Sequence, residues 1–152
     1  MIRLLYLSHF RPEMMASDIS DIMKTSTERN ASLGVTGCLL ATDGQFLQLL
    51  EGPQPAIEEL MRSIRADPRH MIDIETAAEA CTTRCFPDWS MGYAALPSGH
   101  VLFNTVIEDG SATLYESVAK AINRRISLYQ SLNKVRIQTK RFLDIADDMR
   151  RM

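Results

Sequence analysis

Residues 43–53 read Asp-Gly-Gln-Phe-Leu-Gln-Leu-Leu-Glu-Gly-Pro, and the fold of the chain is decided around them. The Asp-Gly pair tolerates the positive φ angles of a tight turn, so it predicts a hairpin between the strand-like runs 35–42 and 45–51. Both faces of the run 45–51 are apolar except at Gln48, which indicates a strand that is covered on both sides.

Before this hairpin, the chain shows a strand pattern and then a helix pattern. The apolar residues 2–8 predict a first strand. Ser17 or Asp18 is expected to cap a helix whose apolar residues recur at helical spacing, and Gly34 is expected to end it. The hairpin is therefore expected to follow a β-α unit.

After the hairpin, a helix pattern and strand patterns follow again. Apolar residues between 57 and 64 recur at helical spacing, and Asp67-Pro68 closes that helix. A weaker strand is expected near residues 71–79 and a last strand near residues 89–95. The order β-α-β-β-α-β with one further strand predicts an α+β fold, a ferredoxin-like sheet with two helices on one face.

We expect two parts in the chain: a domain of residues 1–96 and a C-terminal helical extension of residues 97–152. Within the extension, residues 112–150 read as two helices with a break near Asn133-Lys134. Each helix has an apolar stripe that needs cover, so docking on the open face of the sheet, a homo-oligomer contact, or both are expected. The stripes are Leu114, Val118, Ile122, Ile126 and Tyr129, and then Phe142, Ile145, Ala146 and Met149.

The overall composition argues against several classes of protein. The chain has 152 residues, of which 45% are hydrophobic and 24% charged, the usual balance of a soluble globular domain. Its net charge of −2 offers no global attraction to nucleic acid or to an anionic membrane. No apolar run approaches the roughly 20 residues of a membrane span. Three cysteines without a secretory signal indicate reduced thiols and a cytoplasmic location.

Three polar side chains stand where the pattern favours apolar ones. Gln48 interrupts an apolar strand face, and Tyr6 brings a hydroxyl group to the apolar first strand. Ile22 and Asn30 lie two helical turns apart on one stripe, which would carry Asn30 toward the sheet. A buried amide or phenol that lacks a partner costs about 1–3 kcal/mol, so each of these groups needs one.

Two interpretations of these polar groups stay open. They could satisfy one another or a water molecule within the core. They could instead bind a planar heterocycle between the two helices, flanked by Ile22, Phe46 and Ile64. The pattern alone gives the two interpretations similar weight and does not name a ligand.

The chain also resembles a known family, the BLUF domains, which sense blue light with FAD. The resemblance runs from about Ile2 to Ala95 and rests on a series of motifs that keep the order of the family. They are Tyr6-x-Ser8, Asn30, Leu33-Gly34-Val35-Thr36-Gly37, Asp43 to Pro53, Asp67-Pro68-Arg69-His70 and Arg84 to Gly92.

The resemblance implies FAD as the cofactor, with FMN able to substitute in vitro. The flavin ring is implied to lie between the two helices, where Asn30 and Gln48 would bond its edge and Tyr6 would bond Gln48. The further cofactor-binding residues implied by the resemblance are Ile22, Arg29, Phe46, Ile64, Asp67, Arg69 and His70.

The same resemblance implies a photoreceptor and not an enzyme. Tyr6 and Gln48 would form the photochemical switch, in which an electron and a proton leave Tyr6 and the Gln48 amide rearranges. Ser8, Trp89 and Met91 would relay the signal, with Trp89 and Met91 on the last strand. The output would be an unknown downstream signalling protein, and a homo-oligomer through the C-terminal helices is expected.

Other sites and functions fit the residues less well. Cys81 and Cys85 lack further ligands at short spacing, so no metal site is expected. Nine of the 17 basic residues fall in 120–152 among acidic ones, which favours a solvated face over a nucleic-acid interface. A ferredoxin-like regulatory domain that binds another small heterocycle is the alternative function. A flavin-dependent oxidoreductase is disfavoured, because the chain has no Gly-rich nucleotide loop.

Overall fold

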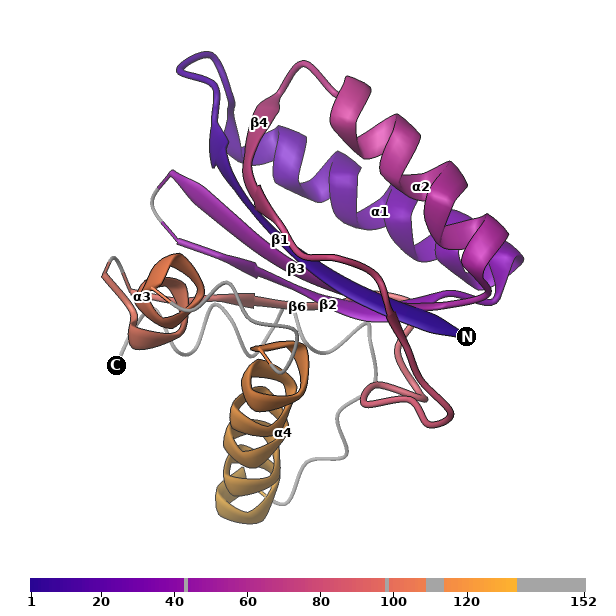
Figure 1. The fold of residues 1–152 in the computed structure, drawn as a ribbon. Coiled ribbons are helices and arrows are strands. Elements are labelled where there is room, and N and C mark those ends of the chain that lie inside the picture. The colour runs from indigo at the N-terminus through magenta and orange to yellow at the C-terminus, as the bar shows by residue number, and fades with distance from the viewer. Residues whose placement is uncertain (43, 98, 109–113, 134–152) are drawn as a thin grey trace.

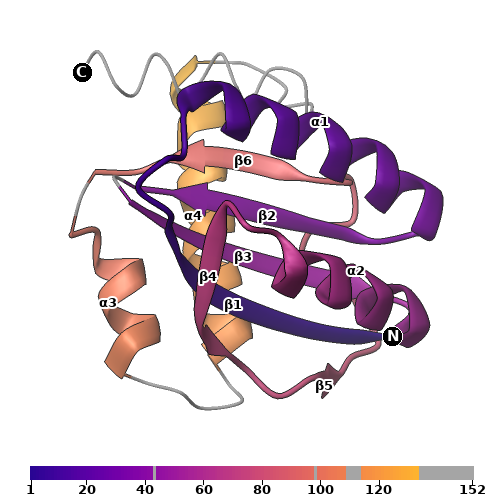
Figure 2. The same ribbon diagram turned by 90° about the horizontal axis from the view of Figure 1, so that it is seen from above.

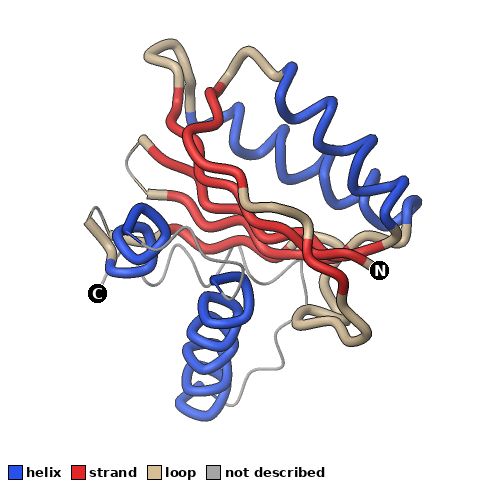
Figure 3. Tube along the Cα trace, in the orientation of Figure 1, coloured by secondary structure: helices blue, strands red, loops and turns tan. Residues whose placement is uncertain are grey.

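The computed structural model describes residues 1–42, 44–97, 99–108 and 114–133, which form one sheet with helices on both sides (Figure 1). In chain order the elements are β1 (Ile2–Phe10), α1 (Ala16–Leu33), β2 (Thr36–Ala41), β3 (Gln45–Gly52), α2 (Gln54–Ala66), β4 (His70–Glu75), β5 (Glu79–Ala80), β6 (Gly92–Ala95), α3 (Val101–Glu108) and α4 (Leu114–Asn133). Figure 3 shows the same path by secondary structure.

The strand order of the sheet is β4-β1-β3-β2-β6, with β5 paired to β1. The first four strands of this order pair antiparallel, and β6 joins β2 as a parallel edge strand (Figure 2). In this register Tyr6 of β1 lies directly opposite Gln48 of β3, and Leu39 of β2 lies opposite Gln48 on its other side. Cross-strand partners share a face, so these three side chains point the same way.

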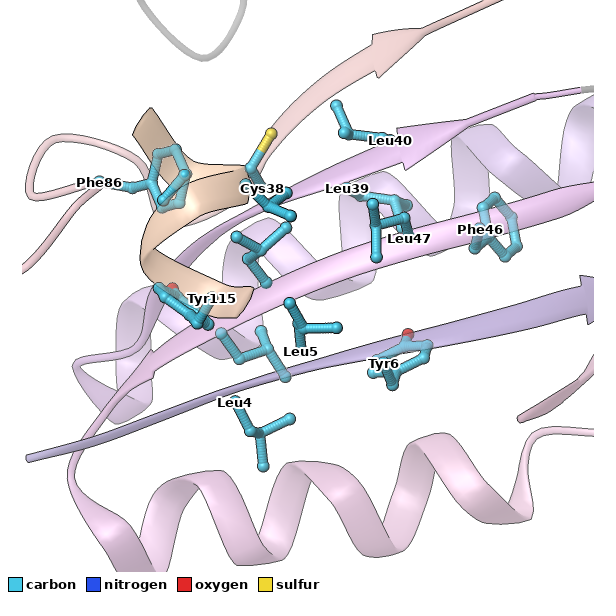
Figure 4. Packing of buried hydrophobic residues seen from close by; sticks show 14 of the residues in the cluster. Leu4, Leu5, Tyr6, Cys38, Leu39, Leu40, Phe46, Leu47, Phe86 and Tyr115 are labelled. Atoms are coloured by element: carbon cyan, nitrogen blue, oxygen red, sulfur yellow. The ribbon is translucent and has the colours of Figure 1, made fainter. Parts of the chain in front are cut away.

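Helices α1 and α2 cover one face of the sheet, and α4 packs under the other (Figure 1). This arrangement confirms the predicted α+β, ferredoxin-like fold. The apolar stripe that begins at Leu114 docks on the open face of the sheet, where Val118 and Ile122 are buried with it. Figure 4 shows the buried side chains of the inner strands with Phe86 and Tyr115 among them.

Strand β3 lies in the middle of the sheet, and its side chains are covered on both faces. Leu47, Leu49 and Leu50 are completely buried, as the apolar run predicts. Fully burying a leucine is worth about 1.5–3 kcal/mol, so these residues fix the register of β3. A shift by one residue would carry Gln48 to the opposite face of the sheet.

The first helix begins two to three residues earlier than the sequence suggests. Met15 is the residue before the first turn, and neither Ser17 nor Asp18 caps the helix as predicted. Asp18 instead lies in the first turn and accepts a hydrogen bond from the Met15 backbone N–H at 2.7 Å. An acidic residue in the first turn of a helix can accept a hydrogen bond from the backbone N–H of the residue before the helix. The sequence pattern does not distinguish such a residue from a capping residue. Gly34 ends the helix as predicted, with φ 66°.

The last strand is shorter than predicted, because it begins at Gly92 and not near residue 89. The Gly37 N–H bonds the Trp89 carbonyl at 3.0 Å, whereas the next residue of β2, Cys38, pairs with Gly92. In a regular parallel ladder with this register the Gly37 N–H would bond the Ser90 carbonyl, so the segment before β6 contains one extra residue, as in a β-bulge. Trp89 and Met91 thus precede β6 and do not lie on it.

Two other regions differ from the sequence prediction. The weak strand near 71–79 is divided into β4 and β5, and the apolar residues after Pro97 form helix α3. Helix α4 confirms the first predicted C-terminal helix, while the second one lies in residues 134–152, outside the described residues. Among the described residues, no helix is long and apolar enough to span a membrane.

Replacement of Gly37 by alanine tests the close packing of β2 on β3. A Cβ atom at Gly37 would lie 2.1 Å from the Leu49 carbonyl oxygen, a backbone atom that cannot move without breaking the ladder. We expect Gly37→Ala to lower the free energy of unfolding by about 3 kcal/mol in chemical denaturation. Gly34→Ala is the control, because Gly34 has φ 66° but its added Cβ would have no other part of the described chain within 4 Å, so this change should cost only about 1 kcal/mol. Equal losses in the two variants would contradict this packing.

Candidate functional site

The site is built around a hydrogen bond between two buried side chains of neighbouring strands. Tyr6 and Gln48 are register partners on β1 and β3, and only 3% and 5% of their surfaces are exposed. The Tyr6 hydroxyl donates to the Gln48 Oε1 atom. Burial raises the pKa of Tyr6 well above its usual value, and the negative charge of Asp67 adds to this effect. Tyr6 is therefore a neutral hydrogen-bond donor at any physiological pH.

The other end of the Gln48 amide points to a weak partner. Its Nε2 atom donates to the Met91 sulfur at 3.4 Å, and Met91 is completely buried. A thioether is a poor acceptor, so this N–H would gain by bonding a stronger one. Gln48 thus links Tyr6 to the bulged segment before β6 and keeps hydrogen-bonding capacity for a ligand.

Asn30 fixes the same bulged segment to the first helix. It lies in the last turn of α1, and only 1% of it is exposed. Its Nδ2 atom donates to the Ser90 carbonyl at 2.8 Å. This bond uses one of the two N–H groups, so the amide has a further N–H and its carbonyl oxygen for a ligand.

Apolar side chains separate these amides from water. Phe46 is buried and packs its ring against Phe10 at 4.3 Å, while Ile22 of α1 and Ile64 of α2 are half-buried against the core. The three predicted flanking residues therefore come from β3 and from both helices. Low polarity strengthens each hydrogen bond made within this interface.

At the end of α2, Asp67, Arg69 and His70 border a cleft of about 400 Å³ or lie next to it. Arg69 bonds the Asp67 carboxylate through Nε and Nη2 at 2.6–3.1 Å. Burial alone would raise the pKa of Asp67, but the hydrogen bonds and charge of Arg69 outweigh it and hold this pKa below its usual value. The cleft is lined by Arg11, Arg65, Ala66, Asp67, Pro68, His70, Met71 and Ile72.

His70 connects this cleft to the buried pair. Its ring lies 6.1 Å from the Tyr6 ring and edge-on to Phe46 at 6.0 Å. Burial lowers its pKa, with Asp67 acting in the opposite direction, so the imidazole is largely neutral at pH 7. Within the described part of the chain its Nδ1 atom has no hydrogen-bond partner.

Not all of the predicted site residues converge on Tyr6 and Gln48. Arg29 bonds Ser63 and Glu59 of α2, both at 2.9 Å, and so lies at the surface between the two helices. Trp89 stacks on Phe86 at 5.6 Å, whereas Met91 contacts Gln48 directly. Met91 is therefore in direct hydrogen-bond contact with Gln48.

The Ser8 hydroxyl and the Ser90 carbonyl are two further polar groups of the site. The Ser8 hydroxyl is completely buried on the same face as Tyr6, and no hydrogen bond satisfies it within the described residues. The Ser90 carbonyl, which receives the Asn30 bond, was not predicted, because a backbone carbonyl leaves no signal in the sequence. Together these groups offer donors and acceptors to a planar ring with nitrogen and oxygen atoms along one edge.

Comparison with known proteins shows which family the sequence matches. Residues 1–92 match BLUF, the sensors of blue-light using FAD. The photoactivated adenylate cyclase subunit beta of Euglena longa is 40% identical over 89 residues, which are 58% of this chain and 10% of that protein. The blue light- and temperature-regulated antirepressor BluF of Escherichia coli (strain K12) is 35% identical over 83 residues, 55% of this chain and 21% of that protein.

Solved structures are similar over a larger share of the chain. The dark-state structure of BlrB, a BLUF protein, is 36% identical with a TM-score of 0.65, covering 80% of this chain and 93% of BlrB. A bacterial light-regulated adenylyl cyclase is 26% identical with a TM-score of 0.59, covering 88% of this chain and 36% of the cyclase.

The burial of Tyr6 generates a prediction for alkaline solution. Above pH 10 an unfolded tyrosine loses its proton while Tyr6 keeps it, so this group alone lowers stability, by roughly 1 kcal/mol between pH 10 and 11. Tyr6→Phe removes the contribution, so the stability of this variant should fall less steeply over that range. Denaturant unfolding at stepped pH values measures the two slopes, and identical slopes would show that the folded chain lets Tyr6 ionise.

Proposed function

The chain belongs to the BLUF family of blue-light sensors, and from this premise we propose that it is a photoreceptor that binds FAD and signals by rearranging the Tyr6–Gln48 hydrogen bond. The observation that supports the proposal most directly is the position of Gln48, whose carbonyl end meets Tyr6 and whose N–H end, among the described residues, donates to a thioether. A side chain held in this way would gain a stronger partner for its N–H group by turning toward a ligand.

The residues around the pair fit a flavin ring. Asn30 and Gln48 would bond the edge of the ring, and Ile22, Phe46 and Ile64 would pack against it. The Ser8 hydroxyl, buried without a partner in the described residues, suits an interface that a ligand completes. The cleft beside Asp67 and His70 would receive the rest of the cofactor, with FMN able to replace FAD in vitro.

When bound, flavin supplies absorption of blue light and a strongly oxidising excited state that can accept an electron. Tyr6 would be the electron donor, and its proton would leave toward the Gln48 Oε1 atom that already accepts its hydrogen bond. When Tyr6 has regained its electron and proton, the Gln48 amide would stay rearranged by rotation, tautomerisation or both. No substrate is consumed, and darkness restores the first arrangement.

The energy scale of this switch is small. A glutamine presents a donor at one end and an acceptor at the other, so turning it exchanges hydrogen bonds without moving a charge. Each bond is worth about 1 kcal/mol net, which is enough to bias two arrangements that are nearly balanced. Met91, in contact with the Gln48 N–H, would sense the change first.

We also propose how the chain is divided between sensing and output. Residues 1–96 would hold the flavin, and residues 97–152 would carry the signal to a partner protein or to a second copy of the chain. The named activity of the Euglena longa relative is adenylate cyclase, and the match covers a tenth of that protein. The identity of the partner of this chain therefore does not follow from that likeness.

Two substitutions test the photochemical switch. Tyr6→Phe and Gln48→Leu should leave the purified protein yellow but abolish the reversible red shift of its absorption under blue light, because each removes one member of the hydrogen bond. Absorption spectra taken in darkness, under light and after dark recovery measure the shift. A colourless wild type that releases no flavin on denaturation would refute the proposal, and so would a Tyr6→Phe protein with a normal shift.

A third substitution separates binding from switching. Asn30→Ala should weaken flavin binding at least about fivefold, because it removes a buried polar anchor worth about 1–3 kcal/mol. Ser32→Ala, near the surface of the same helix, is the matched control and should bind as the wild type does. Titration of the flavin-free protein followed by fluorescence gives both affinities. Equal affinities would exclude Asn30 as an anchor.

A further inference from the structure

A second buried polar centre lies on the opposite face of β3. The Glu51 carboxylate, three residues after Gln48, is completely buried. A carboxylate in the interior is costly unless hydrogen bonds compensate it. Four donors surround Glu51: the Phe86 N–H at 2.6 Å, the Cys85 N–H at 2.8 Å, the Thr36 hydroxyl at 3.1 Å and the Tyr115 hydroxyl at 3.3 Å.

These donors come from three parts of the fold. Thr36 belongs to β2, and Cys85 and Phe86 begin the segment that leads to the bulge before β6. Tyr115 belongs to α4, the helix that covers this face of the sheet. The Asn123 side chain of α4 also donates to the Cys85 carbonyl at 3.0 Å. Helix α4 therefore contacts this segment directly at Cys85 and is linked to it indirectly through Glu51.

The segment from Cys85 to Met91 therefore touches both faces of the sheet. At its far end, Met91 accepts the hydrogen bond of Gln48 and the Ser90 carbonyl accepts that of Asn30. Between the ends, Phe86 stacks on Trp89, and the Trp89 N–H bonds the Phe86 carbonyl at 3.3 Å. Packed groups thus form a continuous path from Met91 to the donors of Glu51.

We propose that the buried Glu51 carboxylate is a latch that fastens α4 to the segment Cys85–Met91, so that a movement of this segment at Gln48 loosens α4 from the sheet. The Tyr115 bond, at 3.3 Å, is the longest of the four and is the one that holds α4 to Glu51. The apolar stripe of α4, including Leu114 and Val118, then loses its cover on the sheet. The light dependence of this release rests on the proposed photoreceptor function, whereas the latch itself does not.

Other contacts of α4 distinguish the latch from general packing. The Arg3 guanidinium lies over the Tyr115 ring at 5.2 Å and near Glu116 at 3.6 Å. Both contacts survive in Tyr115→Phe, which removes only the hydroxyl group. Lys120 pairs with Glu116 at 2.9 Å on the exposed side of the helix, takes no part in the bonds of Glu51, and gives a control on the same helix.

Hydrogen exchange in darkness tests the latch without any photochemistry. The flavin-loaded full chain is compared as wild type, Tyr115→Phe, Asn123→Ala and Lys120→Ala. We expect amides of residues 118–127 to exchange about fivefold faster in Tyr115→Phe, which loses the bond to Glu51, and in Asn123→Ala, which loses the direct bond of α4 to the Cys85 carbonyl. Lys120→Ala should match the wild type. Wild-type exchange in Tyr115→Phe would overturn the latch, and so would equal acceleration in Lys120→Ala.

Illumination of the same samples tests the coupling. In the wild type, light should accelerate exchange in α4 while the absorption shifts to the red, and in Tyr115→Phe this light-induced increase should be smaller because the helix is already loosened. A red shift with no change in α4 would overturn the coupling. Absence of the red shift itself would refute the photoreceptor proposal, while the comparison in darkness would still decide the latch.

Discussion

The pairing of β1 with β3 is the constraint on which the rest of the structure depends. It sets Tyr6 opposite Gln48 in a layer where nearly every other side chain is apolar. A buried phenol and a buried amide cannot be left without partners, so the two strands must hold one register for their hydrogen bond to form. The leucines of β3 enforce that register from both faces of the sheet.

Strand β3 therefore carries two buried polar groups with different tasks. Gln48 faces α1 and α2 and meets neutral partners, so its hydrogen bonds can be exchanged at little cost. Glu51 faces α4 and meets four donors, which makes its surroundings costly to rearrange. The segment from Cys85 to Met91 contacts both groups, which gives a physical route from a site on one face to a helix on the other.

Much of the fold follows from residue patterns, and the errors have local causes. The β2–β3 hairpin, helices α1 and α2, and the end of α1 at Gly34 follow from the alternation of apolar residues, helical spacing and turn residues. The predicted start of α1 is wrong because an acidic side chain can bond either forward or backward at a helix start. The predicted start of β6 is wrong because a bulge depends on pairing with β2, which is remote in sequence.

Local residue patterns predict the hairpin, the two helices that cover it, and Tyr6, Asn30 and Gln48 as polar groups in apolar positions. Each of these rests on neighbours within a few residues, so spacing alone reveals it. The contacts of Met91 with Gln48, and of Glu51 with both α4 and the segment before β6, become visible only when the chain is folded. Such contacts unite segments at least 34 residues apart, and no local pattern records which of them meet.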